Sequence, residues 1–210
     1  MDKCAGKNTK IIIFASTVFK DANWLSMLKH FKEKDISVTP MTSIYESGVN
    51  QVEMIYTTLE EKAKKDYEKS QRGGCIKLKS INVDSDSEED DEDPEKKQKY
   101  LSPEYIFVFD DLSVELRESA IESLLKKNRH FLCKVIISSQ AYIDMSPSER
   151  TQLDFLLLFP KIPEEKLKQI HKDSDLSISY EKFLELYFLA TKSNFNFLYV
   201  DTRNDLFREF

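Results

Sequence analysis

Two adjacent carboxylates, Asp110 and Asp111, directly follow the uninterrupted apolar run Tyr105–Phe109. This run has the composition of a strand that is buried on both faces of a parallel sheet. In open parallel sheets, ligands bind beyond the carboxyl ends of the strands, where these two side chains would project. Asp110 could hold the water shell of Mg²⁺ there, and Asp111 could orient or deprotonate an attacking water. In the plainer alternative, the second aspartate only begins the next turn or helix.

A neutral polar side chain follows the next apolar run of the chain. Gln140 comes after Cys133–Ser138, where its amide could hydrogen-bond a γ-phosphate or the attacking water. Polar residues after strands are common, so Gln140 alone is weak evidence. One strand ending in acids and the next ending in an amide, with a single helix between them, form a more specific combination. The strand with its two acids has the arrangement of a Walker B motif.

The elements that must position these residues alternate between strand and helix. Lys10–Ala15 predicts a buried strand, and Asp21 predicts the N-cap of a helix that ends near Lys34. The remaining predicted elements are a strand at Ile36–Pro40, a helix from Val52 that stops by Gly73, a helix at Ser113–Lys127, a strand at Leu153–Phe159, a helix opening at Pro163, a helix at Ser179–Thr191 and a strand at Phe195–Val200. This alternation predicts right-handed βαβ units and an α/β fold, with helices on both faces of a parallel sheet.

A run of acidic residues interrupts this alternation. The whole chain of 210 residues has a net charge of −6, but Asp84–Asp93 holds eight carboxylates, and without them 31 basic residues face 29 acidic ones. The net charge therefore does not exclude a nucleic-acid partner. Residues 73–100 predict a flexible acidic insertion between two parts of one domain, 1–72 and 101–210. Alternatively, this insertion mimics nucleic acid, binds a protein partner or is phosphorylated at Ser85 and Ser87.

The overall composition excludes several other classes of protein. Hydrophobic residues make up 40% of the chain, which excludes collagen-like and fully disordered chains. No apolar stretch predicts a membrane span or a signal peptide, so we expect a soluble intracellular protein. The cysteines are odd in number and widely spaced, which favours reduced thiols: Cys4, Cys75 and Cys133. The three histidines form no metal-ligand spacing with them: His30, His130 and His171. Scattered lysines could meet phosphate backbones, although a solvated face explains them more simply: Lys126, Lys127 and Lys134.

The order of these features resembles the DNA-packaging ATPases of poxviruses, giant viruses and virus-like Polinton or Maverick transposons, which belong to the FtsK/HerA branch of P-loop NTPases. The resemblance rests on the run Ile106–Leu112, Arg129-His130, the strand that ends in Gln140, Pro147 with Arg150, and Leu156–Phe159. Ile11–Trp24 is similar to the second strand and following helix of that family. Phe183–Tyr199 and Phe207–Phe210 are similar to its terminal helix, strand and tail. The resemblance covers most of the chain outside residues 70–100.

This resemblance implies an ASCE-type P-loop NTPase core in which Asp110 and Asp111 are the Walker B acids and Gln140 is the sensor. Asp110 would hold Mg²⁺ through water. Arg150, or alternatively Arg129, would be the finger that reaches the nucleotide of a neighbouring subunit, although a surface or ion-paired arginine is the simpler interpretation. The implied cofactors are ATP and Mg²⁺. The implied partners are double-stranded DNA and a homo-oligomeric ring, in which ATP hydrolysis at subunit interfaces drives the DNA into a capsid.

One element of the family pattern is missing from the sequence. Nowhere does the chain contain Gly-x-x-x-x-Gly-Lys-[Ser/Thr], the loop whose backbone N–H groups hold phosphates. Gly6-Lys7 stands before a strand instead of between a strand and a helix, and we interpret it as coincidence. The predicted core therefore lacks its first strand, its phosphate loop and the following helix, on the order of 30 residues for part of a βαβ unit.

Three hypotheses follow from this absence. In the first, the chain is a partial or inactive copy of a packaging ATPase, which binds no nucleotide alone and associates through exposed sheet edges and apolar faces. In the second, it is a non-catalytic interaction module built on a degenerate NTPase fold, with the acidic insertion as the contact. In the third, it is a nucleotide hydrolase whose phosphate site has an unrecognised sequence.

Overall fold

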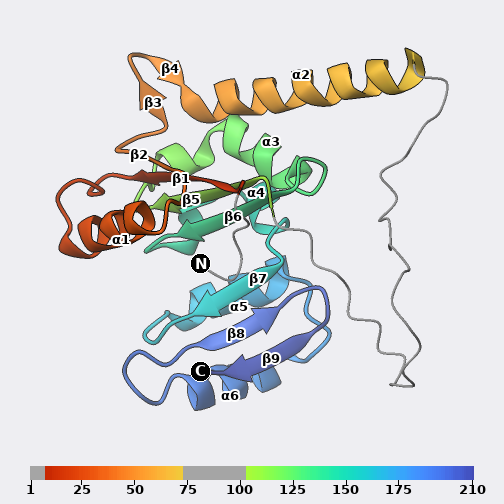
Figure 1. Ribbon diagram of the computed structural model, residues 1–210. Coiled ribbons are helices and arrows are strands. Elements are labelled where there is room, and N and C mark those ends of the chain that lie inside the picture. The colour runs from red at the N-terminus through yellow and green to blue at the C-terminus, as the bar shows by residue number, and fades with distance from the viewer. Residues whose placement is uncertain (1–7, 73–102) are drawn as a thin grey trace, which may run out of the picture.

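The computed structural model describes residues 8–72 and 103–210, which form two sheets with their helices (Figure 1). The first sheet is parallel, and its strand order β2-β1-β5-β6 consists of β2 (Val38–Met41), β1 (Lys10–Ala15), β5 (Tyr105–Asp110) and β6 (Cys133–Ser138). The second sheet is antiparallel, with β7 (Phe155–Leu158), β8 (Leu198–Asp201) and β9 (Leu206–Glu209). A small hairpin joins β3 (Tyr45–Glu46) to β4 (Val49–Asn50). The acidic insertion expected at 73–100 lies outside the described residues.

Helices cover both faces of the parallel sheet, as the alternation of elements predicts. Helix α1 (Ala22–Glu33) packs on one face, and α2 (Gln51–Arg72) with α3 (Ser119–Lys127) packs on the other. Successive side chains of a strand point to opposite faces. Ile11 and Ile13 accordingly join the core under α1, whereas Ile12 and Phe14 join the core under α2 and α3. The fold is therefore mixed α/β around a four-stranded parallel sheet.

Aromatic packing holds the two central strands in register. Phe14 of β1 and Phe109 of β5 are fully buried, and their rings stack with centroids 5.1 Å apart. Burying each such ring stabilises the fold by about 1.5–3 kcal/mol. The strands therefore end together, with Asp110 of β5 opposite Ala15 on one side and Ser138 on the other.

The C-terminal strands differ from the expectation of one continuous parallel sheet. Instead of extending that sheet, β7 and β8 pair antiparallel, and β9 adds a strand in the tail where none was predicted. Burial alternates along β7, with Leu156 and Leu158 buried and Phe155 and Leu157 exposed. A continuous apolar run gave no sign of this alternation. Helices α5 (Glu164–Asp173) and α6 (Tyr180–Ala190) cover the buried face.

The helix predicted at Ser113–Lys127 is also divided. A 3₁₀ turn at Glu115–Arg117 precedes α3, and the extended backbone of Glu118 separates the two. The apolar side chains of α3 are nevertheless buried, including Ile121 and Leu124. A further 3₁₀ turn (Tyr142–Asp144) and the short α4 (Pro147–Arg150), neither of them predicted, follow β6. Within 8–72 and 103–210, no helix combines the length and apolar character needed to cross a membrane.

Candidate active site

The carboxyl edge of the parallel sheet gathers the polar residues that follow β5 and β6. Asp110 is the last residue of β5 and lies opposite Ser138, the last residue of β6. Asp111 takes a left-handed backbone conformation with φ 54°, which aspartate tolerates better than most residues. Its N–H donates to the Ser138 carbonyl at 3.4 Å. The chain thus leaves β5 in a turn that stays attached to β6.

Gln140 reaches the same edge from β6. Its Nε2 donates to Asp111 Oδ1 at 3.4 Å, a long and therefore weak hydrogen bond. Both side chains are exposed, so water and small solutes can reach them. The structure thus brings together the two strand ends that the sequence pattern singles out.

Trp24 holds the other acid of this edge, which sequence reasoning missed. Its indole N–H donates to Asp110 Oδ2 at 3.1 Å across 86 residues of sequence. Asp21 fixes the start of α1 by accepting from the backbone N–H groups of Asn23 and Trp24, which places the indole in the first turn. From the sequence, Trp24 was placed only in the helix that follows the first strand. The one available signal was that the only tryptophan of the chain begins the helix after β1, the strand beside β5.

The two carboxylates could hold a magnesium ion only with help from other ligands. Trp24 and Gln140 each occupy one carboxylate oxygen, so Asp110 Oδ1 and Asp111 Oδ2 have no hydrogen bond within the described ranges. The same ranges contain no group of three or more His, Cys, Asp or Glu side chains that could hold a metal ion. Mg²⁺ usually binds one or two carboxylates together with waters and substrate phosphates. The residues present fit that pattern, with a nucleotide and water supplying the remaining ligands.

Arg150, expected as a finger, is instead held inside the protein. Its Nη1 pairs with Asp173 Oδ2 at 3.1 Å, and its Nε donates to the Met145 carbonyl at 3.0 Å. The guanidinium also lies over the Tyr142 ring, 4.9 Å from its centroid. Only 10% of the Arg150 side chain and 12% of the Asp173 side chain are exposed. These contacts tie the segment after β6 to α5, and the role of Arg150 as a finger stays a prediction.

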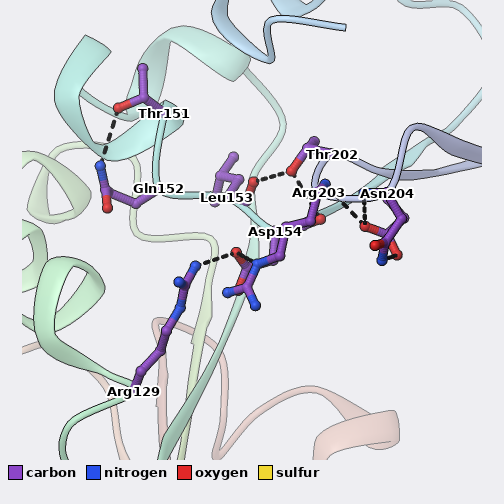
Figure 2. A network of polar contacts seen from close by, with 9 residues as sticks. Arg129, Thr151, Gln152, Leu153, Asp154, Thr202, Arg203 and Asn204 are labelled. Atoms are coloured by element: carbon purple, nitrogen blue, oxygen red, sulfur yellow. Dashed lines mark hydrogen bonds and ion pairs between the residues drawn. The ribbon is translucent and has the colours of Figure 1, made fainter. Parts of the chain in front are cut away.

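Arg129, the alternative finger, lies on the surface in a polar network (Figure 2). Its side chain is 66% exposed, and its Nη2 pairs with Asp154 Oδ1 at 2.9 Å. Asp154 also binds Arg203, and Thr202 donates to the carbonyls of Leu153 and Asp154. The network connects the loop after α3 with β7 and with the turn between β8 and β9. Arg129 therefore helps to join the two sheets.

A buried carboxylate supports the loop beyond Gln140. Glu149 is fully buried and closes a capping box with Ser146, which begins α4. Its Oε1 has no hydrogen-bond partner among the described residues, and burial raises the pKa of this carboxyl. Beside it lies an open hollow of ≈ 380 Å³ lined by Arg117, Ile143, Met145, Ser146, Pro147 and Arg150. Arg117 donates there to the Ile143 carbonyl, so both guanidiniums at this hollow already bind the protein.

The chain has a likeness to solved structures at low sequence identity. No protein-family model and no curated protein matches the chain. Among solved structures, the chain is similar to B204, the DNA-packaging ATPase from Sulfolobus Turreted Icosahedral Virus, with 15% identity, 96% of each chain covered and a TM-score of 0.47. It is also similar to the genome packaging NTPase B204 from Sulfolobus turreted icosahedral virus 2. The complex with AMPPCP gives 13% identity, 97% of each chain and a TM-score of 0.46, and the complex with ATP-gammaS gives 14%, 96% and 0.46.

Proposed function

We propose that this chain carries the acid and sensor part of a nucleotide-hydrolysing domain of a DNA-packaging motor, and that it works only with a phosphate loop that its own sequence does not contain. The observation that carries this proposal is the hydrogen bond between Asp111 and Gln140 at the carboxyl edge of β5 and β6. It supports a shared site because both side chains come from neighbouring parallel strands and face solvent together.

Each residue of this edge has a distinct role in the proposal. Trp24 fixes the Asp110 carboxylate, which leaves Oδ1 for the water shell of a magnesium ion. Asp111 orients the attacking water and accepts its proton, and Gln140 hydrogen-bonds that water or the terminal phosphate. Bound Mg²⁺ would supply charge neutralisation for the phosphates of ATP.

The open edge of β6 supports the need for a further strand. In the described part of the chain, β6 pairs with β5 alone, and Ile136 on β6 is 44% exposed. An unpaired strand with an exposed apolar side chain is a ready template for another strand. We propose that a strand leading into a phosphate loop adds to β6, which would bring the loop beside Asp111 and Gln140. Without it, the chain lacks the N–H cradle and the lysine that neutralise phosphate charge, and it does not hydrolyse ATP.

The partners belong to the same proposal. The resemblance implies a homo-oligomeric ring that moves double-stranded DNA. Within such a ring, Arg129 is the better finger candidate, because surface ion pairs contribute about 0–1 kcal/mol and can be released, whereas the Arg150 pair is buried.

ATP turnover tests this proposal. A strand, phosphate loop and helix are fused before residue 8, and Mg²⁺-dependent ATP hydrolysis is measured for the fused and the 210-residue chains. We expect turnover only in the fused protein, and we expect Asp110→Asn and Asp111→Asn to abolish it. Arg117→Gln is the control, because Arg117 is exposed and lies outside the set of Asp110, Asp111 and Gln140. Turnover that survives the Asp110 change would refute the assignment.

A second candidate function is a non-catalytic interaction module. The observation that favours it is the large apolar surface of the second sheet, where Phe155, Leu157 and Phe159 are each about half exposed. If the fused protein binds no nucleotide while the 210-residue chain binds a protein partner, the module is the better description.

A further inference from the structure

The second sheet has one face covered by helices and one face that no described helix covers. The register places Leu157 of β7 opposite Tyr199 of β8, and Tyr199 opposite Arg208 of β9, on the side away from α5 and α6. We call this side the aromatic face, and it consists of Phe155, Leu157, Phe159, Phe197, Tyr199 and Phe210, with Arg208 at one edge. It lies in a different sheet from the acids of the candidate active site.

The aromatic face is continuous across all three strands. The Phe155 and Tyr199 rings stack at 5.9 Å between centroids, and Tyr199 meets Phe210 edge to face at 6.1 Å. Phe210 stacks on Phe197 at 5.3 Å, and Phe197 contacts Phe159 at 5.2 Å. Each ring is thus held by a neighbour, so the face is a preformed surface instead of a set of separate side chains.

The exposed area approaches what a stable protein interface needs. Phe155 is 49% exposed, Leu157 53%, Phe159 52% and Phe210 56%. At roughly 200 Å² for a whole side chain, these four side chains expose about 420 Å², and the partly exposed Phe197 and Tyr199 bring the face to on the order of 500 Å² of apolar surface. This lies at the upper end of what monomers expose, and with a polar rim it comes close to the about 800 Å² per partner of a standard interface.

The charges on this face favour a protein over a nucleic acid as its occupant. Arg208 is exposed and makes no ion pair with any described residue, and aromatic residues with an arginine are the side chains that interface cores favour. A polyanion needs several cations, but residues 153–210 carry eight Lys and Arg against ten Asp and Glu.

We propose that two copies of the chain pair through their aromatic faces in a two-fold dimer. A two-fold contact uses the same patch on both subunits and closes at two. Because β9 is an edge strand of the second sheet, a two-fold axis that runs parallel to β8 between the two faces places the two Arg208 side chains at opposite rims, away from each other. The aromatic face is then covered by an equal apolar surface. This contact differs from a ring contact, which joins two different surfaces of each subunit.

The test is the oligomeric state of the 210-residue chain by sedimentation velocity, from about 1 to about 100 µM, the range that resolves a micromolar dissociation constant. We expect a monomer–dimer equilibrium. Leu157→Glu and Phe210→Glu each bury a charge in the interface and should raise the dimer dissociation constant at least about 30-fold. Phe188→Glu is the matched control, since Phe188 is 57% exposed on α6, outside the aromatic face, and we expect no change. Circular dichroism of each variant checks that it folds.

Three outcomes would overturn the proposal. The wild-type chain stays monomeric throughout the concentration range, or both aromatic-face variants dimerise as tightly as the Phe188 control. In the third, a labelled single-stranded oligonucleotide binds the wild-type monomer saturably and both aromatic-face variants lose that binding. The last result would assign the face to nucleic acid, since bases stack on exposed aromatic rings.

Discussion

Replacing Arg150 with methionine should cost the protein a large part of its stability. The ion pair with Asp173 is nearly closed to solvent, with 10% and 12% of the two side chains exposed. Removing one partner of a buried pair costs about 3–5 kcal/mol, because the remaining charge stays buried without its counter-charge. Asp173 keeps one hydrogen bond, from the Gln169 amide, which moves the expected loss toward about 3 kcal/mol. Arg150→Met also removes the contacts with the Met145 carbonyl and the Tyr142 ring, which increases the expected loss of stability.

Urea unfolding followed by far-UV circular dichroism measures this loss. Arg129→Met is the matched control, because the Arg129 side chain is 66% exposed and its pair should contribute less than about 1 kcal/mol. The double variant Arg150→Met/Asp173→Leu should recover most of the stability, since it removes both charges of this buried pair. A loss of stability below about 1 kcal/mol for Arg150→Met would refute the structural role of this ion pair.

Three further predictions concern buried or site-bound groups. Burial raises the pKa of Glu149, so the folded chain holds the carboxyl proton more tightly than the unfolded chain does. The protonated carboxyl therefore adds stability that is fully present below pH 4.5 and is lost as the pH rises through the folded pKa. Glu149→Gln keeps the capping box, so unfolding curves should show its advantage over wild type growing with pH. Asp110→Leu removes the acceptor of the Trp24 indole, and the emission of this single tryptophan should shift. Burial raises the pKa of Cys133 to about 12, so peptide mass spectrometry should find it alkylated far more slowly in the folded chain than in urea.

The parallel sheet and its acidic edge could be predicted because their signals are local. The runs at Lys10–Ala15 and Tyr105–Asp110 are apolar on both faces, which only a strand covered by helices on both sides needs, and the run at Cys133–Ser138 is a short apolar stretch of the same length. Because the strands pair in parallel, their carboxyl ends lie side by side at the same end of the sheet. Asp111 and Gln140 follow those ends within two residues, so their contact needed no knowledge of distant elements.

The second sheet could not be predicted in the same way. Phe155 and Leu157 lie on an exposed face that none of the helices in 8–72 and 103–210 covers, but their sequence pattern is the same as that of a buried strand. The contacts of Arg150 and Trp24 were missed for a different reason. Their partners, Asp173 and Asp110, lie 23 and 86 residues away, and no periodic pattern connects an arginine or an indole to a carboxylate at that distance.

The central claim, that Asp110, Asp111 and Gln140 form the edge of a nucleotide site that needs a separate phosphate loop, is tested most directly by the emission of Trp24. Its indole donates to Asp110, so binding of Mg²⁺ and ATP at this edge should change its surroundings. Titration with magnesium-ATP should give a saturable change in the chain fused to a phosphate loop, a loss of that change in Asp110→Asn, and no change in the 210-residue chain. Saturable, magnesium-dependent binding by the 210-residue chain, or a response in the fused chain that ignores the Asp110 substitution, would contradict the claim.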